Sequence, residues 1–136
     1  MDNLPRYFRV THVVAVLLLA LVFVCGCGGT KTEPVSGIVT MDGKPLKGVT
    51  VIFSPVEGGR GNSVGRTDKA GAYSLVYTIR DKGAITGKYK VLISKTKTTD
   101  EGDVETLPAK YNRDSIFEAD VTASGDNKFN FDLESE

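Results

Sequence analysis

Two cysteines carry the most reactive side chains in this sequence, and they lie two residues apart, at Cys25 and Cys27. A disulfide between them would close a very tight ring, and side chains at i and i+2 of an extended chain point to roughly opposite sides. A zinc site would need further ligands, but there is no third cysteine and the one histidine is His12. Two interpretations remain: a covalently modified cysteine, or two small residues without any chemistry.

The residues before the cysteines have the composition of an export signal. Arg6 and Arg9 give the amino terminus a positive charge, and an uninterrupted apolar run follows from Val13 to Val24. A charged start, an apolar block of this length and then small residues are the layout of a secretory signal. A membrane-spanning helix would need about 20 apolar residues. The pattern therefore predicts a signal peptide over residues 1–26.

The residues VCGC, Val24–Cys27, resemble the lipobox of bacterial lipoproteins. In that family, the cysteine that follows an apolar residue, a small residue and then glycine or alanine is lipidated and becomes the first mature residue. The resemblance implies lipidation of Cys27, whereas Cys25 matches poorly because a bulky valine stands before it. It also implies an exported chain, anchored in the membrane of the bacterial cell envelope on its periplasmic or outer face. Residues 27–34 would then be the lipidated cysteine and a flexible tether.

Behind the signal, the available side chains argue against catalysis. Residues 28–136 contain no histidine and no cysteine, so Ser-His-Asp and Cys-His catalysis lack their base. The glycine-rich stretch from Glu57 to Gly65 lacks the lysine and the Ser/Thr arrangement of a phosphate-binding loop. We therefore expect no enzymatic activity, no catalytic residue and no cofactor.

One segment, residues 95–114, has enough acidic side chains to suggest a site. It shows no periodicity and is longer than most connections in a compact domain, which is typical of a functional or mobile loop. Its clustered acidic residues are Asp100, Glu101, Asp103 and Glu105. They offer oxygen ligands for calcium or a carboxylate pair for acid-base work, but the spacing is not that of an EF-hand, and solvated charge is the favoured interpretation. We expect Leu107 and Tyr111 to pack back on the domain.

The charge balance argues against a nucleic-acid partner. The 17 basic residues equal the 17 acidic ones, and removal of residues 1–26 leaves 15 basic against 16 acidic residues. Nucleic-acid binding requires a basic surface.

A basic strip along one exposed strand face would consist of Lys88, Lys90, Lys95 and Lys97. Such charges usually keep an exposed face soluble, which is the favoured interpretation here.

From Val35 onward, apolar and polar residues alternate with period two, which indicates half-buried strands. The residues predicted to face a core are Val49, Val51, Phe53, Tyr73, Leu75, Tyr77, Ile79, Tyr89, Val91, Ile93, Phe117, Ala119, Val121, Phe129, Phe131 and Leu133. Turn residues such as Asp42-Gly43 separate the runs. The pattern predicts an all-β fold over residues 35–136, with six or seven strands in two antiparallel sheets packed face to face as a β-sandwich.

Two stretches, Val35–Pro55 and Gly65–Leu75, resemble the carboxypeptidase regulatory-like domains, which are also described as transthyretin-like or prealbumin-like. The matching residues are Gly37, Val39, Gly43, Pro45, Leu46, Gly48, Val51, Thr67, Asp68, Gly71 and Tyr73. The resemblance covers nearly all of Val35 to Glu134 and implies a seven-stranded antiparallel β-sandwich. Its motifs carry little chemistry, because Asp68 and Gly71 are explained by a tight turn and Tyr73 by an inward position.

These features together predict an exported, membrane-anchored lipoprotein whose noncatalytic β-sandwich binds an envelope protein or a glycan, or supports the envelope structurally. The alternatives are a periplasmic enzyme accessory and a carbohydrate- or calcium-binding module that uses residues 95–114. A carbohydrate module needs exposed aromatic platforms. The sequence has no tryptophan, and alternation directs Tyr73, Tyr77 and Tyr89 inward.

Overall fold

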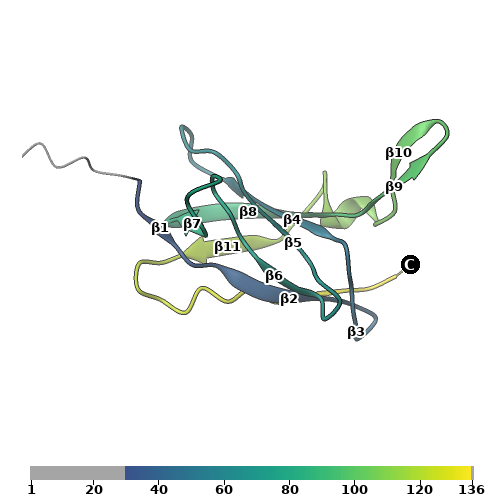
Figure 1. Ribbon diagram of the computed structural model, residues 1–136, viewed down its shortest axis with the longest axis horizontal. Coiled ribbons are helices and arrows are strands. Elements are labelled where there is room, and N and C mark those ends of the chain that lie inside the picture. Colours follow the sequence, from purple (N-terminus) through teal and green to yellow (C-terminus); the bar gives the residue numbers. More distant parts are fainter. Residues whose placement is uncertain (1–29, 136) are drawn as a thin grey trace, which may run out of the picture.

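The computed structural model describes residues 30–135, so the predicted signal peptide and Cys27 lie outside the described residues. Within that range the chain is all-β, with one short 3₁₀ helix, η2, at Ala109–Tyr111 (Figure 1). The strands are β1 (Thr32–Glu33), β2 (Ser36–Met41), β3 (Lys44–Pro45), β4 (Thr50–Pro55), β5 (Ser63–Arg66), β6 (Ala72–Ser74), β7 (Ala84–Ile85), β8 (Gly87–Ser94), β9 (Thr96–Thr99), β10 (Gly102–Glu105), β11 (Glu118–Val121) and β12 (Phe131–Leu133). The first strand thus begins inside the segment expected to be a tether.

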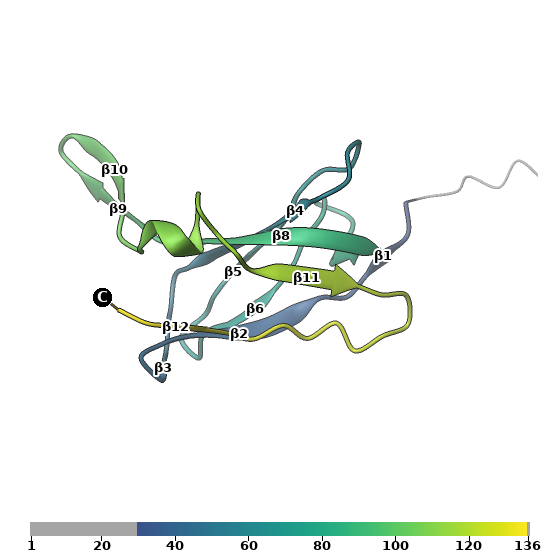
Figure 2. The ribbon, with the colours of Figure 1, turned by 180° about the vertical axis from the view of Figure 1, so that it is seen from behind.

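Two four-stranded sheets form the body of the molecule (Figure 2). In one, the order β11-β8-β4-β5 is joined by antiparallel pairs throughout. In the other, β2 is central and pairs with β12, β3 and β6. The β12 pairing is parallel, which departs from the expected antiparallel sheet, because the segment after β11 crosses between the sheets and enters beside β2 in the same direction. The prediction of an all-β fold is confirmed, and the predicted antiparallel pairing holds throughout the β11-β8-β4-β5 sheet but not between β12 and β2.

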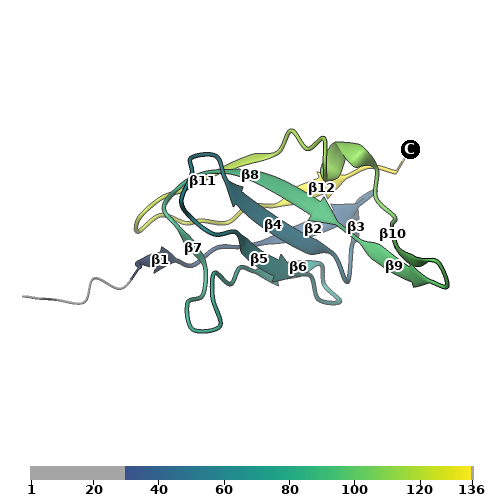
Figure 3. The ribbon, with the colours of Figure 1, turned by 90° about the horizontal axis from the view of Figure 1, so that it is seen from above.

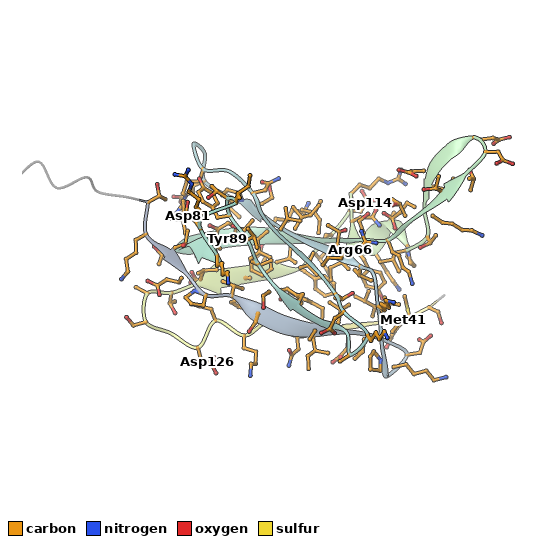
Figure 4. The ribbon with its side chains drawn as sticks, viewed as in Figure 1. Met41, Arg66, Asp81, Tyr89, Asp114 and Asp126 are labelled. Carbon is orange, nitrogen blue, oxygen red and sulfur yellow. The ribbon has the colours of Figure 1, made fainter. Side chains whose placement is uncertain are left out.

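The core lies between these sheets, where the alternation of the sequence predicted it. In β4, Val51 and Phe53 are completely buried, and in β8 the same holds for Tyr89, Val91 and Ile93. The Phe53 ring lies 5.7 Å from the ring of Tyr89, which Figure 4 shows in the interior. Such tilted aromatic pairs add to the stabilisation from buried apolar area. The two central strands of this sheet therefore supply much of the core, and the edge strand β11 adds the buried Val121.

One predicted inward run ends earlier than expected. β6 stops at Ser74, Tyr77 is only half-buried, and Ile79 is completely exposed. The reason is a turn in which the Thr78 hydroxyl donates to the Asp81 carboxylate at 2.6 Å and the Asp81 N–H donates to the Thr78 carbonyl at 3.2 Å. The prediction that Ile79 faces the core is wrong, because this turn, at the Asp81 label in Figure 4, takes it out of the sheet.

The Asp68–Gly71 motif forms the tight turn that the sequence predicted. The Asp68 carboxylate accepts the N–H groups of Ala70 at 2.8 Å and of Ala72 at 3.0 Å. Gly71 has a φ of +73°, and a Cβ there would lie 2.5 Å from the carbonyl oxygen of Val39. Only glycine meets both requirements at low cost. The motif is therefore structural.

Thr67 and Tyr73, on either side of the Asp68–Gly71 turn, connect the turn to the core through hydrogen bonds. The buried Thr67 hydroxyl donates to the Leu46 carbonyl at 2.6 Å and accepts the Val49 N–H at 2.9 Å. The Tyr73 hydroxyl donates to the Phe129 carbonyl at 2.7 Å, and burial raises the pKa of Tyr73 far above its ordinary value. Tyr73 therefore stays neutral, and its inward position agrees with the prediction.

Candidate functional site

The strand β8 joins two structurally different ends of the molecule. At its start, β7 pairs with β1, so Thr32 and Glu33 lie beside Ile85 and Ala84. At its finish, Ser94 leads almost directly into β9. All three ribbon views place β1 and the β9–β10 hairpin at opposite ends (Figures 1, 2 and 3). The eight residues of β8 span about 26 Å, and the hairpin lies beyond them.

The segment 95–114, expected as a loop without periodicity, begins with a regular hairpin. β9 and β10 pair antiparallel from Thr96↔Glu105 to Thr99↔Gly102. Every residue of both strands is exposed, and in the described part of the chain they pair with no other strand. The loop prediction is wrong here because period-two alternation marks a strand only when one of its faces is buried.

Glu105 fastens the hairpin to the body. Its Oε1 accepts the N–H groups of Lys95 at 2.9 Å, Thr106 at 3.0 Å and Leu107 at 2.9 Å, and its Oε2 accepts the Ser94 hydroxyl. Partial burial pushes the pKa of Glu105 upward, but these hydrogen bonds outweigh it, so the pKa lies below its ordinary value. A carboxylate engaged in this way is an anchor and a poor general base.

The remaining acidic residues do not converge. Asp103 accepts the Thr98 hydroxyl at 2.7 Å, while Asp100 and Glu101 form the exposed turn. Among residues 30–135 there is no group of three or more His, Cys, Asp or Glu side chains that could hold a metal ion. In the part that the structure describes, the hairpin is a polar projection without an assembled calcium site.

The root of the hairpin packs back on the sandwich, as predicted. Leu107 and Tyr111 are buried. The Tyr111 ring stacks on the Phe117 ring with 5.8 Å between centroids, and the Tyr111 hydroxyl accepts the Glu134 N–H at 2.8 Å. The hairpin therefore projects from a fixed base.

The expected lysine strip is interrupted by acidic neighbours. Lys88 and Lys90 lie on the outer face of β8, but the β11–β8 register puts Asp120 beside Lys88 and Glu118 beside Lys90. Lys95 is half-buried at the end of the sheet and does not continue the row. The hollow on this part of the surface has a volume of about 400 Å³ and is lined by Val56, Lys88, Tyr89, Glu118, Ala119 and Asp120. The face carries both signs of charge side by side.

Aromatic side chains are absent from the exposed surface of residues 30–135. Tyr73 and Tyr89 are buried as predicted, Tyr77 is half-buried, and burial raises the pKa of Tyr89. Stacking on a sugar needs an accessible aromatic face. The described surface therefore offers no fully exposed aromatic ring for a glycan, although Tyr77, Phe117 and Phe129 are half-buried.

An aliphatic row on the outer face of the β11-β8-β4-β5 sheet was missed by the sequence reasoning. Its members are Val76, Val64, Ile52, Leu92 and Ile116, and we call this set the aliphatic row. The signal for it was present: Val51-Ile52-Phe53 and Val91-Leu92-Ile93 are consecutive apolar residues, so both faces of these strands are apolar. A strand with two apolar faces has a partner on each side or leaves one face exposed.

The lipidation site predicted at Cys27 lies outside the described residues. Within residues 30–135, no helix has the length and the apolar composition needed to span a membrane.

The comparisons with known proteins add little to this picture. No protein-family model matches the chain, and no curated protein matches it. A search of solved structures found a 9R-lipoxygenase from Cyanothece PCC8801, 14% identical, with a TM-score of 0.38 over 90% of this chain and 20% of that one. The chain thus spans about a fifth of the lipoxygenase's length. A likeness at this level supports no inference about fold or activity.

Proposed function

We propose that the chain is an exported lipoprotein, anchored through Cys27, whose noncatalytic β-sandwich presents the β9–β10 hairpin to another component of the cell envelope. The observation that carries the proposal is the placement of the amino-terminal strand and the hairpin at opposite ends of the molecule. An anchor at one end turns the other end away from the membrane. The hairpin then becomes the first part of the protein that an approaching partner meets.

The lipid supplies the attachment in this proposal. One acyl chain holds a protein only marginally, at about 0.8 kcal/mol for each buried methylene, whereas two or three chains hold it stably. Only Gly28 to Lys31 separate Cys27 from the first strand. Four residues reach at most about 14 Å. β1 would therefore stay close to the membrane surface.

Two properties support a contact role for the hairpin. It is fully exposed, and the Glu105 carboxylate holds its root in place, so its strands are presented without a large ordering cost on binding. Between Thr96 and Glu105 there are four acidic side chains and one lysine. This charge favours a partner with basic groups, either an envelope protein or a modified glycan. The sandwich itself acts as a spacer in this proposal.

Metabolic labelling with a fatty-acid analogue tests the anchoring. Cys27→Ser should remain an unlabelled precursor, because the acceptor thiol is gone, while the matched variant Cys25→Ser should be labelled and processed like the wild type. Gel mobility and label incorporation give the readout. Equal labelling of wild type and Cys27→Ser would rule out this anchoring.

A further inference from the structure

The aliphatic row crosses the outer face of the β11-β8-β4-β5 sheet, whose backbone Figure 3 shows from above. Ile52 pairs with Val64 on one side and with Leu92 on the other, and Val64 bridges to Val76. Extending the β11–β8 register by two residues places Ile116 beside Leu92. With strands about 4.8 Å apart, five neighbouring side chains form a continuous line of about 19 Å.

The row is exposed at both of its ends. Ile116 is 86% exposed, Val76 43% and Val64 40%, with Ile52 and Leu92 half-buried between them. Single exposed aliphatic residues are ordinary, but a contiguous line on a sheet face is typical of a contact surface. The row therefore marks this sheet face as a candidate contact surface, with its most exposed member, Ile116, at the β11 edge.

Four charged side chains on β8 and β11 lie beside the Leu92–Ile116 end of the row, and their arrangement favours a second copy of the chain as the partner. β8 carries a column of two cations, Lys88 and Lys90, and the adjacent β11 carries two anions, Asp120 and Glu118, at matching heights. None of the four belongs to an ion pair within the described part of the chain. A two-fold rotation can place the basic column of one copy opposite the acidic column of a second copy, and the acidic column of the first opposite the basic column of the second.

We infer that the β8–β11 edge of this face is a self-association surface, and that two copies of the chain pack through it about a two-fold axis parallel to the strands, midway between β8 and β11. Only β8 and β11 of the two copies then overlap, so Leu92 and Ile116 enter the contact, while Ile52, Val64 and Val76 lie beside it. That rotation exchanges the two columns. Lys90 then faces Glu118 of the second copy, Lys88 faces Asp120, and Leu92 faces Ile116. Sheets that pack face to face with nearly aligned strands are a common arrangement, with about 10 Å between the sheets.

The direction of the axis agrees with attachment to one membrane, and this step rests on the anchoring proposed above. β8 runs from the β1 end of the molecule to the hairpin end. An axis parallel to β8 keeps both amino-terminal strands at the same end, so both lipids can enter the same bilayer. Co-anchoring also raises the effective concentration of each copy for the other.

The first test compares two exposed isoleucines in the full-length protein, extracted from cells in detergent and measured by sedimentation. The wild type should be dimeric. Ile116→Asp should weaken association at least tenfold, because it places a carboxylate in the apolar contact. Ile79→Asp is the matched control, since Ile79 is also highly exposed but lies on the Thr78–Asp81 turn, outside β8 and β11. A monomeric wild type, or equal weakening by the two substitutions, would overturn the inference.

The second test separates contacts between copies from contacts within one copy. Lys90→Glu and Glu118→Lys each place like charges side by side in their own sheet and across the proposed interface, so each protein alone should be monomeric. In an equimolar mixture, positions 90 and 118 of one chain, both acidic, face positions 118 and 90 of the other chain, both basic. Each chain still has two like charges side by side in its own sheet. The mixture should therefore form heterodimers. If the two variants stay monomeric when mixed while the wild type dimerises, the proposed axis is wrong.

The anchoring proposal fails independently of this one. A protein that incorporates the fatty-acid label but stays monomeric contradicts the self-association surface and leaves the anchoring intact. A dimer that is sensitive to Ile116→Asp, from a chain that takes up no label, supports the surface and removes the anchoring.

Discussion

Two consecutive strands, β8 and β9, share the same extended backbone but have opposite surroundings. In β8 alternate side chains are completely buried, with Tyr89, Val91 and Ile93 facing the second sheet. In β9 every residue is exposed, and the strand is kept in place by its pairing with β10 and by the Glu105 carboxylate at the root. The comparison teaches that the body is stabilised by apolar burial and the hairpin by polar bonds, so the two should respond to different perturbations.

The largest difference is expected from removal of a buried ring. Phe53→Ala should reduce the free energy of unfolding by about 3–5 kcal/mol, because it deletes a completely buried aromatic side chain and leaves a cavity. Val104→Ala on β10, where the side chain is 51% exposed, should change it by less than about 0.5 kcal/mol. Urea unfolding followed by circular dichroism measures both. Similar losses would show that the hairpin belongs to the cooperative core.

A smaller effect is expected from glycine substitutions that differ only in their surroundings. Gly71 and Gly43 have φ values of +73° and +76°, so alanine is strained at both positions by about 1–2 kcal/mol. A Cβ at Gly71 would also meet the Val39 carbonyl at 2.5 Å, whereas at Gly43 nothing lies within 4 Å. Gly71→Ala should therefore lower the thermal midpoint more than Gly43→Ala does. Equal shifts would mean that the turn around Gly71 does not pack on β2 as described.

The smallest effect is local and concerns the hairpin root. Because the folded state lowers the pKa of Glu105, the anchoring contributes fully above the ordinary glutamate pKa and is lost as the pH falls through the lowered value. At this exposed position the contribution is on the order of 1 kcal/mol or less. The amide proton shifts of Lys95, Thr106 and Leu107 should titrate together in acid, and Glu105→Gln should abolish the titration.

Glu101→Gln, at the exposed turn of the same hairpin, is the matched control and should leave those three amide titrations unchanged. If the titration persists in Glu105→Gln, another group anchors the hairpin, and the role assigned to this carboxylate is contradicted.

The parts of the fold that could be predicted are those in which burial of one strand face produces an alternation of apolar and polar residues in the sequence. Tyr89, Phe131 and Leu133 alternate with polar neighbours, and their inward positions are confirmed. The Asp68–Gly71 turn could be predicted because its residue types have specific backbone roles. The transthyretin-like topology with seven strands stays a prediction.

The missed features have physical explanations. The β9–β10 hairpin has solvent on both faces, so its threonines and acidic residues give no alternation. Ile79 continues an apolar pattern, but the Thr78–Asp81 hydrogen bonds decide its position. The aliphatic row was hidden in apolar triplets such as Val91-Leu92-Ile93, where a buried and an exposed apolar face look alike in the sequence. The role of Glu105 depends on partners that only the folded chain brings together.

The most direct test of the proposed arrangement is energy transfer from a dye on the lipidated protein to acceptor lipids in the membrane surface. A cysteine introduced at Lys31, beside β1, or at Thr98, on the hairpin, would be the one free thiol of the proposed mature chain, from which Cys25 would be removed with the signal and in which Cys27 would carry the lipid. The span of β8 alone puts about 26 Å between the two ends. Strong transfer from position 31 and weak transfer from position 98 is the predicted result. Equal transfer from both positions, or stronger transfer from position 98, would contradict the account.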